Sequence, residues 1–217
     1  AKTAYFDIVY EADSGLMIKN QLFYDGIVNL NENSYGFSQF HDSYVIEDKI
    51  VVSKTFENNA GKFSFQFSPS IRYTEYFHRV DLTKGYDALS DRLLSTECDC
   101  DYSNYLWGNY TDYGIAGLTD LDFNFGLNVV LGLRYDHIEA KSTYDPAKMN
   151  NTPDVVSASG SQGDWSWTAS VSYELPFGVI PYVTASRQST VIAGQGSEIA
   201  AGDIAAGQFM TASRMYE

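Results

Sequence analysis

The sequence predicts an all-β protein, an antiparallel transmembrane β-barrel. Three observations favour this fold class. Long segments alternate apolar and polar side chains, as a strand with two different faces requires. The connections between these segments alternate between short and long, which a soluble sandwich gives no reason to expect. Aromatic residues make up 15% of the chain, with 17 Tyr and 13 Phe, and membrane barrels carry aromatic girdles at both interfaces.

The clearest two-faced strand is 127–139, with the sequence LNVVLGLRYDHIE. One face of this strand is apolar and contains Leu127, Val129, Leu131, Leu133 and Tyr135. The other face contains Asn128, Val130, Gly132, Arg134 and Asp136. A strand of this length exceeds the usual five or six residues of a globular strand. It fits a tilted strand that crosses a bilayer, which needs roughly 9–11 residues.

The same alternation predicts the other strands in chain order. Segment 62–77 is the most regular, with Phe63, Phe65, Phe67 and Ile71 on one face and small or polar residues on the other. Pro69 lacks a backbone N–H, which predicts a bulge or kink there. The final residues, SRMYE, resemble the beginning of one more strand. The predicted strands are 3–12, 16–27, 44–56, 62–77, 112–121, 127–139, 165–175 and 179–190.

The connections predict how the strands are oriented. Short turns are expected at 13–15, 57–61, 122–126 and 176–178, and long loops at 28–43, 78–110, 141–164 and 191–212. Outer-membrane barrels have short periplasmic turns and long extracellular loops. The strands that follow the short turns are therefore expected to run outward.

The charge and composition exclude several classes of protein. The formal net charge is −14, which argues against nucleic-acid binding because that function needs a basic surface. No apolar run approaches the length of a transmembrane helix. The first residues, AKTAYFDIVYEA, lack the features of a signal peptide, so an exported protein would be represented here by a mature or partial chain.

The two cysteines, Cys98 and Cys100, are too few for a disulfide framework. Three alternatives remain open for them: two thiols, one bridge, or a metal site with neighbouring carboxylates.

No catalytic motif was found, so we expect no enzymatic activity, no cofactor and no metal site. The sequence contains no GxSxG, HExxH, P-loop or paired CxxC pattern. The three histidines, His41, His78 and His137, fall at predicted strand ends or in loops. They are interpreted as solvated or interfacial residues, and they form a joint metal site only if the fold brings them together.

Aromatic residues before the fifth predicted strand are candidate ligand contacts, because aromatic faces supply contact area and stacking for a bulky ligand. These residues are Tyr102, Tyr105, Trp107 and Tyr110. The alternative is that they form an interfacial aromatic belt or pack within their own loop. A second aromatic set is expected to anchor the strands in lipid: Tyr135, Trp165 and Tyr173.

Two arginines on the polar faces of their strands, Arg72 and Arg134, are the other candidate ligand contacts. A guanidinium group binds anions through paired hydrogen bonds. Each arginine is expected to line the barrel interior and to contact a plug or an anionic substrate. The alternative is an ion pair with Asp136 or Glu174 inside the barrel.

Two segments resemble the C-terminal half of the barrel of TonB-dependent receptors, especially ferric-siderophore receptors. The segments are GLRYDHIEA at 132–140 and WSWTASVSYELPFGVIPYVTASRQS at 165–189. The terminal MYE is similar to the opening of the next strand in that family. Looser matches occur at TAYFDIVYEA, LFYDG and FSPSIRYTEYF.

The resemblance implies a 22-stranded barrel closed by a plug, of which residues 1–217 would form one part of the wall, without the plug domain and without the C-terminal strands. It implies active import of a ferric siderophore or a similar scarce ligand across the bacterial outer membrane. The implied partners are that ligand, a TonB-type energy-coupling protein acting through the plug, lipid and lipopolysaccharide. Two alternatives remain open: a passive porin-like channel and a secreted soluble β-sandwich that binds carbohydrate.

Overall fold

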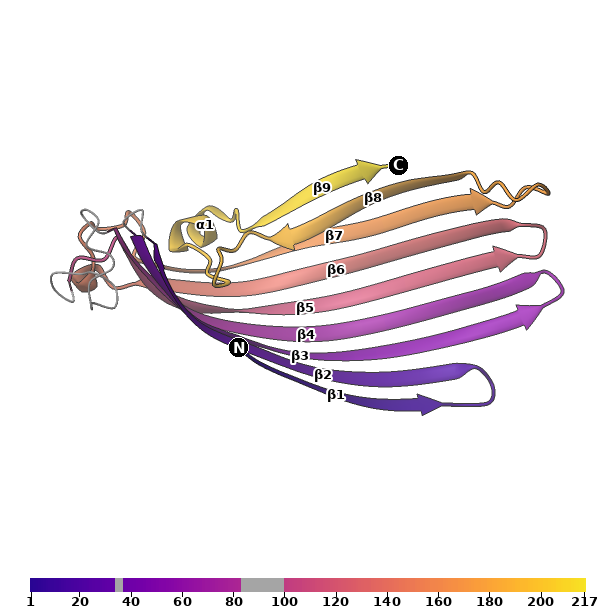
Figure 1. Ribbon diagram of the computed structural model, residues 1–217, viewed down its shortest axis with the longest axis horizontal. Coiled ribbons are helices and arrows are strands. Elements are labelled where there is room, and N and C mark those ends of the chain that lie inside the picture. The colour runs from indigo at the N-terminus through magenta and orange to yellow at the C-terminus, as the bar shows by residue number, and fades with distance from the viewer. Residues whose placement is uncertain (34–36, 83–99) are drawn as a thin grey trace.

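The computed structural model describes residues 1–33, 37–82 and 100–217. The described strands form one antiparallel sheet in which each strand pairs with the next along the chain (Figure 1). In order they are β1 (Lys2–Glu11), β2 (Leu16–Asn33), β3 (Phe37–Asn58), β4 (Gly61–Leu82), β5 (Asn104–Phe123), β6 (Leu127–Tyr144), β7 (Ser157–Tyr173), β8 (Tyr182–Val191) and β9 (Met210–Tyr216). Among the described residues, two short helices lie in the connections: the 3₁₀-helix η2 (Pro146–Lys148) and α1 (Ala201–Ala206). All-β architecture is therefore confirmed.

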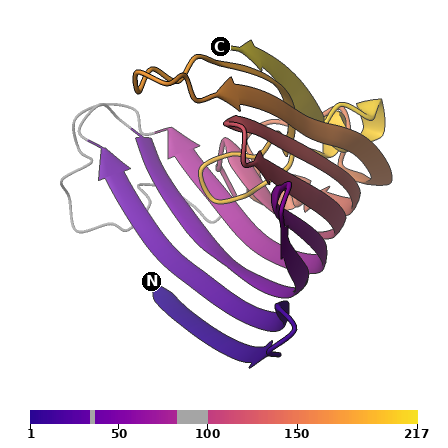
Figure 2. The same cartoon turned by 90° about the vertical axis from the view of Figure 1, so that its right-hand side faces the viewer.

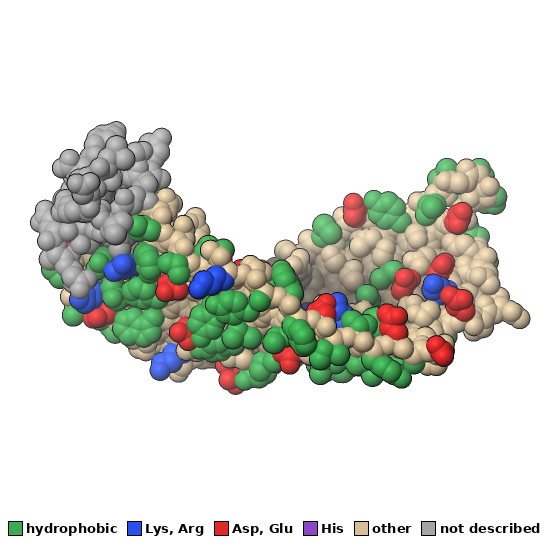
Figure 3. Space-filling model, turned by 60° about the horizontal axis from the view of Figure 1, so that its bottom comes forward, with side chains coloured by type: hydrophobic (Ala, Val, Ile, Leu, Met, Phe, Trp, Pro, Cys, Tyr) green, Lys and Arg blue, Asp and Glu red, His purple; other side chains and the backbone are tan. Residues whose placement is uncertain are grey.

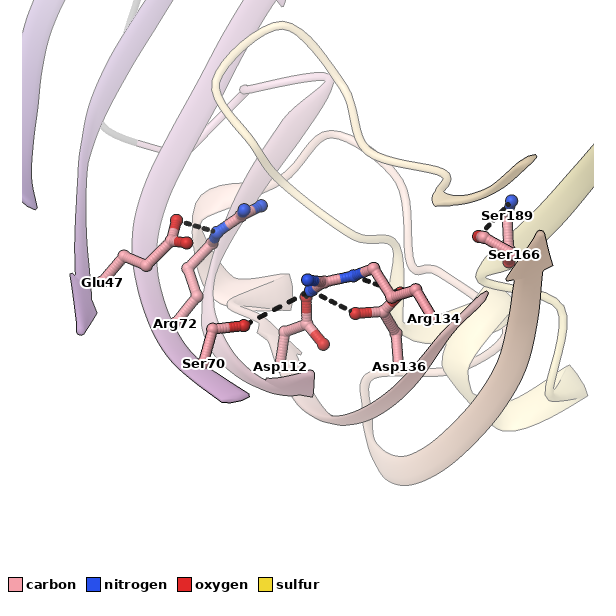
Figure 4. Close-up of polar contacts among 8 residues, drawn as sticks. All are labelled: Glu47, Ser70, Arg72, Asp112, Arg134, Asp136, Ser166 and Ser189. Atoms are coloured by element: carbon pink, nitrogen blue, oxygen red, sulfur yellow. Dashed lines mark hydrogen bonds and ion pairs between the residues drawn. The ribbon is translucent and has the colours of Figure 1, made fainter. Parts of the chain in front are cut away.

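The sheet is curved into an open trough (Figure 2). We call the concave side, which carries Arg72 and Arg134, the inner face (Figure 4). The convex side is the outer face, where Leu131 and Leu133 are 47% and 51% exposed. Hydrophobic side chains gather along the N-terminal edge of the sheet, with acidic and basic residues among them (Figure 3). The two faces predicted for 127–139 are thus confirmed, and the apolar one is the convex one.

Glycines shape three of the four short turns. Gly15, Gly126 and Gly178 have φ of 78°, 93° and 80°, a backbone region that is open to glycine and costly for most other residues. The remaining turn joins β3 to β4, and there the Asn58 side chain accepts a hydrogen bond of 2.8 Å from the Ala60 N–H. The short turns lie at one end of the sheet and the long connections at the other (Figure 1), as the sequence predicts.

The strands continue further into the predicted long loops than the sequence indicates. Strands β2 and β3 take up most of the predicted loop 28–43 and stay paired as far as Asn33 and Phe37. The ends of the loops 78–110 and 141–164 are also strand, while 34–36 and 83–99 lie outside the described residues. The loop prediction was wrong here because backbone pairing holds these extensions, and it requires no apolar side chains.

Pro69 does not introduce the predicted bulge. Lys49 pairs with Ser70 and Val52 with Phe67, so β3 and β4 keep the same register on both sides of the proline. No extra residue is inserted; the pairing is merely interrupted between these positions, which fits the missing donor of proline. On its other side Pro69 pairs with Ile115 of β5.

The C-terminal part differs from expectation in two places. Strand β8 begins at Tyr182 and not at 179, and the predicted loop 191–212 contains α1 and the first residues of β9. The extra strand predicted from SRMYE is confirmed as β9. Because the described strands form a single sheet, the two-sheet sandwich alternative is wrong.

None of the helices in the described residues is long and apolar enough to cross a membrane.

The outer face generates the first prediction. Leu133 lies on this face, six residues into β6 from the short turn. Leu133→Arg should lower the free energy of unfolding in lipid by about 2–4 kcal/mol, the cost of a cation facing the middle of a bilayer. Gln66→Arg, on the inner face of β4, is the matched control and should cost less than about 1 kcal/mol. Denaturant titration in vesicles measures both, and equal losses would contradict the assignment of the faces.

Candidate functional site

Charged side chains from four neighbouring strands meet halfway along the inner face (Figure 4). Arg134 of β6 binds Asp136 of the same strand with both Nε and Nη2, at 2.9 Å and 2.5 Å. The same Nη2 is 3.9 Å from Oδ2 of Asp112 on β5 and donates a 3.4 Å hydrogen bond to Oγ of Ser70 on β4. Both carboxylates are largely buried, with side chains 11% exposed. One guanidinium therefore neutralises two acidic groups that would otherwise repel each other.

Gly114 lets Arg134 lie across the sheet. A Cβ at Gly114 would come within 2.2 Å of the Arg134 Nη2 and 2.7 Å of the Ser70 Oγ. The missing side chain leaves the surface of β5 open, so the guanidinium group spans from β6 to β4. The sequence does show Gly114 inside a strand, and such a glycine often marks the close approach of another group.

Arg72 forms a second, more open ion pair. Its Nε donates to Oε2 of Glu47 on β3 at 2.9 Å, and its side chain is 44% exposed. Figure 4 shows the terminal nitrogens of Arg72 turned into the space that the sheet encloses. Of the two predicted arginines, Arg72 is therefore the one with donors available to another molecule. The alternative predicted for Arg134, an ion pair with Asp136, is confirmed.

A cavity of about 560 Å³ lies against this network. Its wall contains both arginines, Asp112 and Asp136, together with Tyr110, Ile138 and polar groups of β8. Asp112 Oδ1 is buried and has no hydrogen-bond partner among the described residues. The wall thus offers a mixed set of donors and acceptors beside apolar surface, which is how pockets for small molecules are commonly built.

The connection between β8 and β9 packs on the inner face beside the long loops. Three of its apolar residues, Ile199, Ile204 and Phe209, are at most 3% exposed and join a cluster with Tyr76, Leu106 and Ile138. The Tyr76 hydroxyl donates to the Ile199 carbonyl at 3.0 Å. The Gln162 Oε1 accepts from the Phe209 and Met210 N–H groups at 3.1 Å. This packing was not predicted from the sequence, because the spacing of Ile199, Ile204 and Phe209 fits neither the helix period of 3.6 residues nor the strand period of 2.

The four predicted aromatic contacts do not form one cluster, and they are not all in a loop. Tyr105, Trp107 and Tyr110 belong to β5, because the strand alternation continues through them. Tyr105 and Trp107 lie on the outer face with ring centroids 6.4 Å apart, and Tyr105 also contacts Phe77 and Tyr102, at 5.1 Å and 5.3 Å. Tyr110 is buried on the inner face, 6.4 Å from Tyr76.

The outer aromatic cluster resembles an interfacial belt. It continues across β3 and β4 through Phe77 and Phe40, whose rings are 5.9 Å apart. The Arg79 guanidinium lies 4.7 Å from the Phe40 ring centroid. A second pair, Tyr135 and Trp165, with centroids 4.8 Å apart, lies on the same face of β6 and β7. The structure therefore separates the aromatic candidates from the inner cavity, apart from Tyr110.

The interpretation of the histidines as solvated residues was wrong for two of them. His41 and His78 are 4% and 5% exposed and lie opposite each other on β3 and β4. Their rings stack with centroids 4.4 Å apart. His137 pairs with Tyr113 on the outer face of β6 and takes no part in this group. The residues were 37 positions apart in sequence, and the register that joins them was not readable from the sequence.

Of the alternatives for the cysteines (two thiols, one bridge, or a metal site), the structure bears on Cys100. Cys100 is disulfide-bonded, so it is not available as a thiolate metal ligand. Cys98 lies outside the described residues.

The fold and the inner face together define this chain as part of the wall of a large β-barrel whose interior is lined by polar and charged groups. The family model of the TonB dependent receptor-like β-barrel matches residues 2–210. The chain belongs to this family, which is one of outer-membrane receptors and transporters. The resemblance seen in the sequence is therefore confirmed.

A solved structure agrees with this assignment. The unliganded ferric citrate transporter FecA matches with a TM-score of 0.69 over 99% of this chain, at 13% sequence identity. The match covers 31% of the FecA chain, so the present chain spans about a third of that transporter. No curated protein matches.

The paired acids give a prediction for stability. Arg134→Ala should lower the free energy of unfolding by about 1–3 kcal/mol, because it leaves Asp112 and Asp136 close together without a cation. The loss would be larger if the ion pair were completely buried. Adding Asp112→Asn should recover part of the loss, since it removes the repulsion. Chemical unfolding of the three proteins measures this coupling. Strictly additive changes in the free energy of unfolding would show that Arg134 and Asp112 do not interact.

The packed connection between β8 and β9 gives a second prediction for stability. Tyr76→Phe removes the hydroxyl that bonds to the Ile199 carbonyl and keeps the ring, at a cost of about 1–2 kcal/mol. We expect faster protease cleavage within 192–209, because the connection detaches from the wall more often, and a free energy of global unfolding lowered by no more than the same amount, about 1–2 kcal/mol. Tyr73→Phe removes a hydroxyl from the outer face of the same strand and serves as control; identical cleavage rates in the two variants would contradict the role given to Tyr76.

Proposed function

We propose that this chain forms part of the wall of an outer-membrane receptor that imports a ferric siderophore or a similar iron chelate, using energy supplied through a TonB-type protein. The observation that carries this proposal is the family match along nearly the whole chain, combined with a charged inner face beside a cavity. FecA, which shares the fold, transports ferric citrate, and this supports an iron chelate as the ligand class. Binding and gating perform the function, and no covalent chemistry is proposed.

In this proposal the two arginines have different roles. Arg134 is held by two carboxylates and stiffens the wall where β4, β5 and β6 meet. Arg72 keeps its terminal donors free of the Glu47 pair and contacts an anionic group, either on the chelate or on a plug inside the barrel. Guanidinium donors suit carboxylates because the two groups match in geometry. Tyr110 lies at the same cavity and adds an aromatic contact.

The remaining barrel parts follow from the family and belong to the proposal as well. A complete barrel of 22 strands closes the two open edges of the present sheet at β1 and β9, because unpaired strand edges are not tolerated in hydrocarbon. Tyr105, Trp107 and their neighbours then lie at the outer membrane interface beside lipopolysaccharide.

The passive channel is the second candidate, and energy dependence separates the two. We expect deletion of the gene to slow uptake of iron-labelled ferric citrate or ferric siderophores under iron limitation. We also expect an uncoupler of the proton gradient to abolish the gene-dependent part of uptake. Gene-dependent uptake that survives the uncoupler would favour the channel. No difference between deletion and wild type, across a panel of chelates, would overturn the ligand class while leaving the fold intact.

The role of Arg72 is tested by its neutral variant. Arg72→Gln should raise the half-saturating concentration of the transported anionic chelate by at least about 10-fold, because one charge-assisted hydrogen bond contributes about 1.5–3 kcal/mol. Lys19→Gln is the matched control: it removes a positive charge from another ion pair, with Asp7 at 2.7 Å, far along the sheet. Uptake kinetics at matched receptor levels measure both. Equal effects would assign the loss to net charge alone.

A further inference from the structure

Two histidines and one glutamate meet on the inner face beside the long connections. His41 and His78 face each other across β3 and β4 with their rings 4.4 Å apart and 17° from parallel. Glu198, from the connection that follows β8, reaches the pair, and its Oε1 is 3.1 Å from the His78 Nδ1. Three segments that are far apart in sequence thus contribute one side chain each.

The connection is shaped to hold the glutamate there. The Gly196 N–H donates to Oε2 of Glu198 at 2.7 Å, and the Gly194 N–H donates to the Glu198 carbonyl at 2.8 Å. A Cβ at Gly196 would come within 2.2 Å of the His41 Nδ1, and one at Gly194 within 2.0 Å of the Glu198 carboxylate. Both glycines allow the backbone to pass directly against the cluster.

The histidine nitrogens are buried without sufficient partners. His41 Nδ1 and His78 Nε2 have no hydrogen-bond partner among the described residues, although both side chains are at least nine-tenths buried. Buried polar atoms are normally paired, and those that are not require an explanation such as an ion.

We propose that His41, His78 and Glu198 bind a divalent transition-metal ion, with zinc as the best fit. Two imidazoles and one carboxylate are a ligand set that zinc accepts, with a fourth position open to water. The donor atoms lie within 4.8 Å of one another. In a tetrahedral zinc shell they approach to about 3.3 Å. Side-chain rotations that turn the two rings out of their parallel stack bring the in-plane lone pairs to one point.

A metal ion here would fasten the connection to the barrel wall. The ligands join β3, β4 and the segment before α1, and the residue after Glu198 is the buried Ile199 that accepts the Tyr76 hydroxyl. The ion is a resident part of the wall and is distinct from the iron that is transported. The site lies apart from Arg72 and Arg134, whose ion pairs involve other carboxylates.

The test is a metal titration of the purified receptor encoded by this gene, in detergent, after removal of bound metals with a chelator. We expect the wild type to bind one more zinc ion than His41→Gln or His78→Gln. Each of these substitutions should lower the zinc affinity of the proposed site about 100-fold or more. Glu198→Gln should weaken the site by a smaller factor. Cobalt in place of zinc should give the visible absorption of a four-coordinate ion in the wild type and not in His41→Gln or His78→Gln.

The third histidine supplies the control. His137→Gln removes an imidazole from the outer face and should leave zinc stoichiometry and affinity unchanged. A second measurement is independent of affinity: zinc should slow protease cleavage within 192–209 in the wild type and not in His41→Gln. Identical zinc stoichiometry and affinity in the wild type and in both inner histidine variants would overturn the proposal, and so would weak zinc binding to all five proteins.

Discussion

The structure depends on the pairing of backbone groups between neighbouring strands. Within hydrocarbon no water is available to bond to an N–H or C=O group, so each must find its partner in the adjacent strand. The long antiparallel ladders from β1 to β9 meet this requirement. Because successive side chains in each strand point to opposite sides, the ladders also sort the side chains into an outer apolar face and an inner polar face.

The inner face divides into zones along the strands. The pair of Arg72 with Glu47 and the pair of Arg134 with Asp136 lie halfway along, beside the cavity. Further toward the long connections, the segment between β8 and β9 buries Ile199 and Phe209 against the wall. The histidine pair and Glu198 lie in this second zone. The same strands therefore carry both the packed connection and, nearer the short turns, the charged surface beside the cavity.

Much of the fold was predictable from local patterns. The two faces of 127–139, the glycine turns at Gly15, Gly126 and Gly178, and the alternation of short and long connections were all readable in the sequence. Strand length was not, because the extensions combine backbone pairing with contacts to segments far away in sequence, such as those of Leu106 and Tyr76 with the connection after β8. Tyr105 and Trp107 belong to such an extension, and the ladder of β5 assigns them to the outer face.

The candidate site was predictable only in its parts. Arg72 and Arg134 were found on polar faces, but the reach of Arg134 to Ser70 depends on the missing side chain of Gly114 and on the register of three strands. The meeting of His41 with His78 depends on the pairing of β3 and β4 continuing from their short turn into segments that the sequence assigns to loops, and the approach of Glu198 depends on tertiary packing. Such contacts between distant segments are fixed by geometry that no short stretch of sequence encodes.

The central claim is that the outer face of this sheet meets lipid and the inner face meets the water-filled interior. Spin labels attached one at a time from 129 to 135 in β6, in receptor reconstituted in lipid bilayers, test it most directly. The account predicts that collision with oxygen dissolved in lipid peaks at 129, 131 and 133, while collision with a water-soluble metal complex peaks at 130, 132 and 134. Collision rates without a two-residue period, or with the opposite phase, would contradict it.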